Sequence, residues 1–373
     1  MTPEKLDILF AMIDFNELGI QKVIITLLNS WDDELGSVSL SVHNKNGRFY
    51  DHYNSETPLY VLEELYPSII PVHFIAHTIA YVKLLKRLKP QKVIAVNQAE
   101  ALSLCIAKRF YPNFKLVVCE HCNISESIYD YKGWFGWYYR RNFVREYSQF
   151  ADTIHTVSFE SKEDMVANWG LPADKIKVVY NPVLIKTEDI PAKKHNDKFV
   201  IVAASRLEKQ KRIDILLQGM SVFFNSNPEK RGNICIYIYG DGSLKDELIL
   251  MSKQLKIDDV VEFCGFKSEP WKEVAKADLF VSTSEWEGLS VSLIEAQTVH
   301  TPILASDCPS GNKEICMYGR AGKLFKKNDP NDFAEKLLDI VNNPGQLKEY
   351  VDVANANLDR FSVETIMKQY SML

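Results

Sequence analysis

The feature that most constrains the fold is an alternation of short apolar runs with longer helical runs, which occurs twice along the chain. In the first half, the predicted strands are residues 6–13, 38–42, 58–61, 92–96, 115–119, 153–157 and 177–180. In the second half, they are residues 199–203, 234–239, 260–264, 277–281 and 302–305. Apolar strands that alternate with helices are typical of parallel sheets covered by helices on both faces. The sequence therefore predicts an α/β protein with two doubly wound domains and a cleft between them.

Chain length and composition agree with this organisation. With 373 residues, of which 46% are hydrophobic, the chain is long enough for two globular domains. We expect an N-terminal domain at residues 1–183 and a C-terminal domain at residues 199–355. Residues 184–198 are polar, contain Pro191 and have little periodicity, as is typical of a linker. Residues 356–373 should form a C-terminal helix that packs back on the N-terminal domain.

Charge and hydropathy argue against several classes of protein. The net charge of −5 at pH 7 does not indicate a nucleic-acid binder. No apolar run is long enough to span a membrane, and the N-terminus lacks the basic region and cleavage site of a signal peptide. We therefore expect a cytoplasmic protein, either free or bound peripherally to the inner face of the membrane.

The cysteines do not indicate a metal centre. The seven cysteines are scattered and most lie in apolar runs, which is typical of buried free thiols in a reducing compartment. Cys119 and Cys122 have the spacing of a zinc-ligand pair, but no second Cys or His pair follows at ligand spacing. We therefore expect no metal site.

The stretch 282–296 carries two acidic residues around a predicted helix N-terminus. Glu287 lies in the loop after the predicted strand 277–281, and Glu295 lies one or two turns into a helix that begins near Ser290. Backbone N–H groups at a helix N-terminus attract anions. The stretch could therefore bind a ligand with a phosphate in the middle and hydroxyl groups at both ends, such as a nucleotide sugar. The residues alone leave open an ordinary strand–turn–helix with surface acids.

Two cations occupy a similar position in the C-terminal half. Arg206 and Lys211 follow the predicted strand 199–203 at its carboxyl end. They could stabilise the negative charge of a diphosphate leaving group, although a solvated charge run is the alternative. The sequence contains no G-x-x-x-x-G-K-[ST] or G-x-S-x-G motif, which argues against P-loop and nucleophile-elbow chemistry.

The N-terminal half offers two further candidate residues at the ends of strands. Gly19 begins a predicted helix after a strand and a loop, and His121 comes two residues after the predicted strand 115–119. Ligands of open α/β sheets bind outside the carboxyl ends of the strands, so both positions suit a binding site. The alternatives are that Gly19 only permits a tight turn and that His121 only satisfies a local backbone group.

The stretch 131–147 combines aromatic and basic residues at helical spacing. Its most prominent members are Trp134, Trp137, Arg141 and Arg145. Aromatic rings with cations are typical of a helix at a bilayer interface with anionic headgroups. The alternative is a core helix whose arginines extend to solvent.

Taken together, these residues resemble the motifs of the retaining glycosyltransferases of family 4, which have the GT-B fold of two Rossmann-like domains. Glu287-Gly288-Leu289-Ser290 with Glu295 resembles the E-x7-E signature of that family. The other segments that resemble family motifs are 204–207 with Lys211, 239–242, 263–266, 307–311 with 314–315, 19–23 and 120–121. The match covers nearly the whole chain in the family's order, and the C-terminal motifs are specific as a set.

The resemblance implies a function for each matching residue. Arg206 and Lys211 would bind the diphosphate and stabilise the leaving group. Glu287 would contact the hydroxyl groups of the donor sugar, and His121 would contact that sugar near the reaction centre.

The resemblance also implies a set of donor-binding residues. These are Gly19, Gly240, Phe266, Gly288, Leu289, Ser290 and Glu295. Within the set, Glu295 would bind the ribose, Phe266 would lie near the base, and Gly19 would approach the phosphates. Leu18 and Ser205 stand where the family usually has glycine. The first departure puts the approach of the backbone to a phosphate in doubt.

The implied enzyme is a retaining, metal-independent glycosyltransferase without a cofactor. It would move a sugar from a nucleotide-diphosphate sugar, with a UDP-sugar favoured, to a saccharide or lipid-linked acceptor in the biosynthesis of a cell-surface glycan or polysaccharide. No protein nucleophile is placed for a double displacement, which favours attack on the same face as the leaving diphosphate. The alternatives are a sugar-nucleotide epimerase or phosphorylase of the same fold, or a catalytically silent protein that binds a sugar nucleotide.

Overall fold

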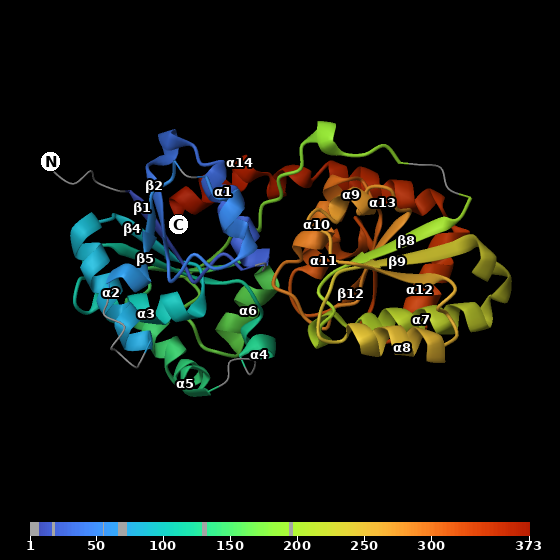
Figure 1. Cartoon of the computed structure of the whole chain (residues 1–373), viewed down its shortest axis with the longest axis horizontal. Coiled ribbons are helices and arrows are strands. Elements are labelled where there is room, and N and C mark those ends of the chain that lie inside the picture. Colours follow the sequence, from blue (N-terminus) through green and yellow to red (C-terminus); the bar gives the residue numbers. More distant parts are fainter. Residues whose placement is uncertain (1–6, 17–18, 55, 66–72, 129–132, 194–196) are drawn as a thin grey trace. The chain divides into compact units, whose positions relative to one another are not determined.

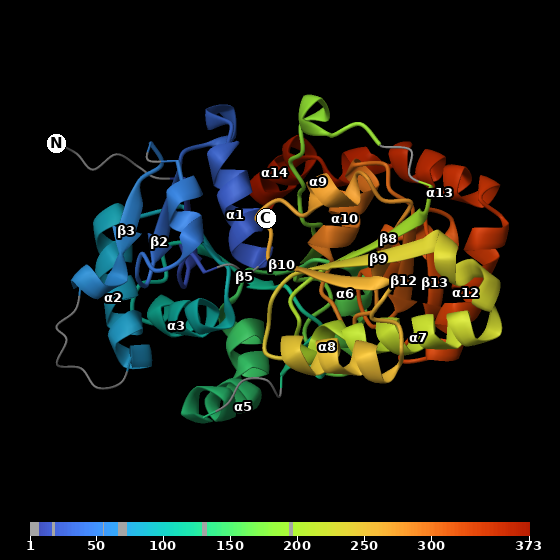
Figure 2. The same cartoon turned by 45° about the vertical axis from the view of Figure 1, so that its right-hand side comes forward.

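The computed structural model describes residues 7–16, 19–54, 56–65, 73–128, 133–193 and 197–373. The chain forms two compact units, one made of residues 1–182 and 362–373 and the other of residues 183–361. Each unit contains one parallel sheet with helices packed against it (Figure 1, Figure 2). The prediction of two doubly wound α/β folds is confirmed.

The sheet of the first unit has seven parallel strands in the order β3-β2-β1-β4-β5-β6-β7. The strands are β1 Ile8–Met12, β2 Val38–Val42, β3 Leu59–Val61, β4 Lys92–Ala95, β5 Lys115–Glu120, β6 Thr153–Thr156 and β7 Ile176–Val178. The helices are α1 Gly19–Asn29, α2 His73–Leu88, α3 Gln98–Lys108, α4 Ile124–Ser127, α5 Gly133–Phe150, α6 Phe159–Ala167 and α14 Val363–Met372. The order reverses between β1 and β4, so the sheet is doubly wound.

Strand β1 is buried on both faces of this sheet, which explains its continuous apolar sequence. Leu9 and Ala11 belong to a core cluster that includes residues of α2, α3 and α5. Phe10 points to the other face, where its ring stacks on Tyr370 of α14 with 6.3 Å between the ring centroids. Because successive side chains of a strand face opposite sides, a strand covered twice must be apolar at every position.

The sheet of the second unit has six parallel strands in the order β10-β9-β8-β11-β12-β13. The strands are β8 Phe199–Ala204, β9 Ile234–Tyr239, β10 Val261–Gly265, β11 Leu279–Ser282, β12 Ile303–Asp307 and β13 Lys323–Lys326. The helices are α7 Ile213–Ser226, α8 Lys245–Gln254, α9 Trp271–Val274, α10 Val291–Thr298, α11 Asn312–Ile315, α12 Pro330–Asn342 and α13 Gly345–Asn355. The order reverses between β8 and β11, and the loops that follow these two strands therefore lie side by side.

The second unit also includes the segment that the sequence assigns to a linker. Residues 184–193, 197 and 198 group with this unit by their contacts, and Val183 N–H donates to the backbone C=O of Phe361 at 3.0 Å. The chain enters the second unit at Val183 and leaves it after Phe361. The segments at which the chain enters and leaves the second unit are therefore joined by a hydrogen bond.

Candidate functional site

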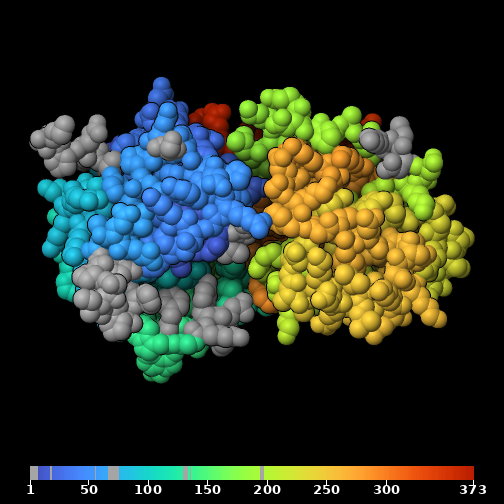
Figure 3. Space-filling view, viewed as in Figure 1, coloured from blue at the N-terminus to red at the C-terminus, as the bar shows by residue number. Residues whose placement is uncertain are grey.

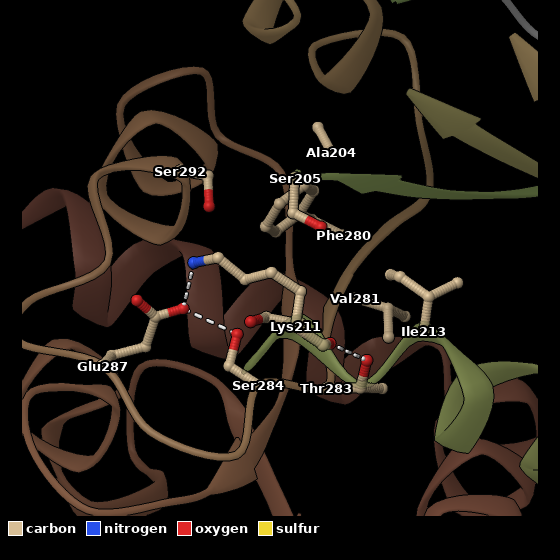
Figure 4. A pocket seen from close by; sticks show the side chains of 11 residues that line it. Ala204, Ser205, Lys211, Ile213, Phe280, Val281, Thr283, Ser284, Glu287 and Ser292 are labelled. Carbon is tan, nitrogen blue, oxygen red and sulfur yellow. Dashed lines mark hydrogen bonds and ion pairs between the residues drawn. The ribbon is translucent and has the colours of Figure 1, made fainter. Parts of the chain in front are cut away.

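The candidate site of the second unit lies where the strand order reverses, at the carboxyl ends of β8 and β11. These strands pair directly, with Leu279 opposite Ile201. In open α/β sheets this switch point leaves a crevice, because the two following connections run to opposite faces. Figure 4 shows the pocket found there. Its lining residues are Ala204, Ser205, Lys211, Ile213, Phe280, Val281, Ser282, Thr283, Ser284, Glu287 and Ser292.

An ion pair between Lys211 and Glu287 lies in this pocket. Lys211 Nζ is 2.6 Å from Glu287 Oε1, and the two side chains are 16% and 9% exposed. Ser284 Oγ donates to the same carboxylate oxygen at 2.6 Å (Figure 4). Thr283 Oγ1 donates to the backbone C=O of Lys211 at 2.9 Å and joins the two loops again. The structure thus brings together a cation and an acid that the sequence assigns to different parts of one ligand.

Arg206 belongs to the same loop as Lys211 but contacts a different partner. It is exposed, and its Nη2 donates to Gln210 Oε1 at 3.3 Å. The 3₁₀ turn Lys209–Lys211 separates the two cations, and Arg212 follows in a left-handed conformation at φ 46°. Lys211 lines the pocket, whereas Arg206 lies outside its lining.

The loop from Glu287 to α10 has the geometry that its spacing predicts. Ser290 is the N-cap of α10, and it is extended at φ −68° and ψ 107°. Its Oγ lies 3.1 Å from Ser292 Oγ instead of capping the helix. Gly288, Leu289 and Ser290 are buried, and Glu295 lies within α10 with 5% of its surface exposed. The N-cap of α10 is therefore an uncharged serine, and the positive end of the helix dipole favours an anion there.

Two glycines allow loops around the pocket to approach backbone to backbone. Gly240 directly follows β9 with φ +137°, and a Cβ built on it would lie 1.8 Å from the carbonyl oxygen of Ser205. Gly311 has φ +63°, and its Cβ would lie 2.5 Å from the carbonyl oxygen of Gly288. Side chains are therefore excluded at both positions, and the loops that carry the two cations and the first glutamate are held by close packing.

Phe266 lies at the carboxyl end of the neighbouring strand β10. Its side chain is 52% exposed, which is unusual for a phenylalanine. Gly240 N–H donates to the backbone C=O of Gly265 at 2.9 Å, so Phe266 starts beside the Gly240 turn. The ring therefore presents exposed apolar surface at the carboxyl edge of the sheet.

His121 and Gly19 belong to the first unit. His121 follows β5 and is buried, with neither ring nitrogen hydrogen-bonded among the described residues. Desolvation by burial, with a smaller effect of His155, lowers the pKa of His121 to about 3, so the imidazole is neutral at neutral pH. Gly19 begins α1, and a Cβ built there would meet nothing within 4 Å. Packing within the first unit therefore does not require this glycine, and Leu18 before it lies outside the described residues.

A group of possible metal ligands surrounds His121, and the sequence spacing did not reveal it. Cys119, His121 and His155 place one ligand atom each within 4.8 Å of one another. Cys119 and His155 are opposite each other on β5 and β6. Burial raises the pKa of the Cys119 thiol well above its usual value and lowers that of His155 to about 4, so the group carries no charge at neutral pH. Only the pairing of two strands, which local spacing cannot reveal, brings His155 here.

Helix α5 has a buried polar anchor on one face and exposed aromatic rings on the other. Tyr139 Oη and Tyr147 Oη each donate to Glu120 Oε1 at 2.8 Å, within the core of the first unit. Trp134 and Trp137 are 54% and 49% exposed. In Figure 3, α5 forms part of the surface of the first unit.

Cations accompany the exposed face of α5. The guanidinium of Arg141 lies 5.4 Å from the Trp137 ring centroid, and Arg145 pairs with the buried Glu146 at 2.9 Å. One face of this helix therefore belongs to the core, and the interpretation of the other face as a membrane surface stays a prediction. Within the described residues, no helix is long and apolar enough to cross a membrane.

Two family models match successive parts of the chain. Residues 19–186 match the model described as "Glycosyltransferase Family 4", and residues 185–357 match the one described as "Glycosyl transferases group 1".

Two bacterial relatives are also named as glycosyltransferases. The chain is 30% identical over 218 residues to the lipopolysaccharide 1,6-galactosyltransferase of Salmonella typhimurium, covering 57% of this chain and 58% of that protein. It is 28% identical over 217 residues to a Campylobacter jejuni transferase named N-acetylgalactosamine-N,N'-diacetylbacillosaminyl-diphospho-undecaprenol 4-alpha-N-acetylgalactosaminyltransferase, covering 57% and 56%. The chain thus spans less than two thirds of the length of either relative.

Solved structures show the same fold. The chain superposes on the crystal structure of Anabaena Alr3699/HepE in complex with UDP with a TM-score of 0.78 and 20% identity, covering 98% of this chain and 99% of that one.

Proposed function

Because the chain belongs to the glycosyltransferases of group 1 and family 4 and has their GT-B fold, we propose that it is a retaining, metal-independent glycosyltransferase. The second unit binds a nucleotide-diphosphate sugar, and the first unit binds the acceptor. A UDP-sugar is the favoured donor, which the UDP complex of the HepE structure supports. The acceptor is a saccharide or a lipid-linked glycan in the biosynthesis of a cell-surface glycan, as the names of the two bacterial relatives suggest.

The observation that carries this proposal is the Lys211–Glu287 pair at the switch point of the second sheet. A diphosphate that enters the pocket competes with the carboxylate for Lys211, and Arg206 adds a second cation from the same loop. The carboxylate of Glu287 then accepts hydrogen bonds from hydroxyl groups of the sugar. Lys211 can thus bind the anionic phosphate while Glu287 binds the hydroxyl groups, which suits a sugar attached to a phosphate.

The other proposed donor-binding residues lie in the loop and helix after Glu287 and directly after β10. Leu289 and Ser290 offer backbone N–H groups to the phosphate or sugar at the N-terminus of α10, and buried Gly288 allows a close approach. Glu295 binds the ribose, and exposed Phe266 stacks near the base.

Three further residues complete the assignment. Gly240 holds the Arg206 loop at its place. On the acceptor side, Gly19 approaches the phosphates, and His121, uncharged at neutral pH, makes a hydrogen bond to the donor sugar near its anomeric carbon.

The reaction proceeds on one face of the sugar. The bond between the anomeric carbon and the diphosphate oxygen breaks, and the electron pair stays on the leaving oxygen. The acceptor hydroxyl attacks from the same face and transfers its proton to that leaving oxygen, so the configuration is retained. Arg206 and Lys211 stabilise the charge that builds up on the diphosphate.

The exposed face of α5 binds an anionic membrane surface, which would bring a lipid-linked acceptor to the first unit. Trp134 and Trp137 enter the headgroup region, while Arg141 and Arg145 contact its phosphates. The proposed location is therefore the cytoplasm, with the protein either free or bound peripherally at the inner face of the membrane.

The test is a thermal-shift screen of the wild type and of Arg206→Ala against UDP-, GDP- and ADP-sugars. Binding raises the apparent stability by mass action. We expect a UDP-sugar to raise the unfolding temperature of the wild type. The same sugar should not shift the unfolding temperature of Arg206→Ala, which without ligand should unfold at the same temperature as the wild type. The release of UDP only when an acceptor is added would then identify transfer. Equal shifts for both proteins would refute the assignment of the diphosphate site.

A further inference from the structure

Gln210 belongs to the loop after β8 and contacts the loop after β11. These two loops carry candidate donor-binding residues. Gln210 directly precedes Lys211 in the turn after β8. Its backbone C=O accepts the N–H of Glu285 at 2.8 Å, and its Nε2 donates to the backbone C=O of Trp286 at 2.9 Å. Both hydrogen bonds hold the segment immediately before Glu287.

The other end of the same amide holds the exposed cation. Gln210 Oε1 accepts a hydrogen bond from Arg206 Nη2 at 3.3 Å. An exposed arginine has many rotamers in solution, and a hydrogen bond to its guanidinium restricts them before a ligand arrives. The arrangement needs a donor and an acceptor on one side chain of this length, which is what a glutamine provides.

We propose that Gln210 is a positioning residue for the transfer reaction, which holds Arg206 ready for the diphosphate and keeps the Glu287 loop in register with it. This inference rests on the proposed function, since it assigns Arg206 to the diphosphate. Gln210 itself does not touch the reacting atoms. It acts through the arginine on one side and through the Trp286 carbonyl on the other.

The effects of the two ends of the Gln210 amide can be tested separately, because other interactions also join the two loops of the pocket. Thr283 Oγ1 donates to the Lys211 carbonyl, and the Lys211–Glu287 pair does not involve the Gln210 side chain. Removal of the amide therefore leaves the ion pair in place and releases Arg206. Because Leu289 and Ser290 follow the Trp286 carbonyl and are also assigned to the phosphate, a double-mutant cycle with Arg206→Ala separates the two sides.

The experiment measures the dissociation constant for UDP by isothermal titration calorimetry with Gln210→Met. This substitution keeps the length of the side chain and removes both of its hydrogen bonds. We expect UDP to bind about tenfold more weakly, the size expected for a lost hydrogen bond to a charged group, with an unchanged unfolding temperature. The matched control is Gln254→Met on the exposed side of α8, which should bind UDP as the wild type does.

A double-mutant cycle with Arg206→Ala separates positioning from a general structural effect. If Gln210 acts through Arg206, the double variant binds UDP no more weakly than Arg206→Ala alone. If Gln210→Met binds UDP like the wild type, or if the two losses add, the inference is overturned while the proposed function stands. If Arg206→Ala itself binds UDP like the wild type, the proposed function and this inference both fail.

Discussion

Replacing Lys211 by methionine should destabilise the second unit, because it leaves the carboxylate of Glu287 buried without its cation. The two side chains are 16% and 9% exposed, and their charged atoms are 2.6 Å apart. Methionine fills most of the space of the lysine stem and removes only the charge. Ser284 Oγ still donates to Glu287 at 2.6 Å.

The size of the effect follows from this burial. Removing one partner of a fully buried pair costs about 3–5 kcal/mol. The hydroxyl of Ser284 and the residual exposure of Lys211 lower this cost, so we expect a loss of about 2–3 kcal/mol in the free energy of unfolding. For a unit of this size, that loss corresponds to a fall in Tm of about 5–10 °C.

Scanning calorimetry without ligand measures the change, and a second lysine of the same unit provides the control. Lys272 pairs with Glu269 at the same 2.6 Å, but these side chains are 45% and 51% exposed. Lys272→Met should therefore change the free energy of unfolding by less than about 1 kcal/mol.

The double variant Lys211→Met/Glu287→Gln completes the test. Because a neutral amide is cheaper to bury than an unpaired carboxylate, it should recover a large part of the lost stability. If Lys211→Met unfolds within about 1 °C of the wild type, or if the double variant is less stable than the single one, burial of the pair is not what holds this loop.

Three further predictions concern other parts of the chain. Gly240→Ala places a Cβ at φ +137° and 1.8 Å from a backbone oxygen, so it should lower the free energy of unfolding by about 2 kcal/mol or more. Gly232→Ala, whose Cβ meets nothing within 4 Å, is the control, and equal unfolding curves would contradict the prediction. His121 is neutral when folded, with a pKa near 3 against 6.5 in the unfolded chain. As the pH falls below 6.5 the unfolded state takes up the proton first, so urea unfolding should show a loss of about 1–2 kcal/mol between pH 7 and pH 5. His121→Asn should show a smaller loss, and an unchanged pH dependence would refute the cause. Replacing Trp134 and Trp137 together by alanine should abolish flotation with anionic liposomes, and unchanged flotation would exclude α5 as the membrane surface.

The buried strands of the second unit and the turn before α10 could be predicted from the sequence, because they depend on local patterns. Continuous apolar runs identify the buried strands, and Gly288 marks the turn that places Glu287 before the helix and Glu295 inside it. Parallel strands present their carboxyl ends at one edge, so the loops of β8 and β11 had to be close. Strand β13 was missed because this short edge strand, Lys323–Lys326, has only two apolar residues between its two lysines.

Contacts between side chains of different loops could not be predicted. The sequence assigns Lys211 and Glu287 to different groups of a ligand, but it contains nothing that shows their direct pairing. Likewise, the sequence does not show that Arg206 contacts Gln210, which lies in the 3₁₀ turn Lys209–Lys211. The position of His155 beside Cys119 depends on the register of β5 and β6, which is set by the whole sheet.

The return of α14 to the first unit has a consequence for biosynthesis. Tyr370 is fully buried and stacks on Phe10 of β1, so the core of the first unit includes two segments from opposite ends of the described chain. During synthesis, the part of β1 that Tyr370 covers therefore stays exposed until residues 363–372 have left the ribosome. The second unit, which is continuous from Val183 to Phe361, can fold before that moment. The unit that is made first is thus the last to be completed, because Phe10 lacks its Tyr370 partner in the interval.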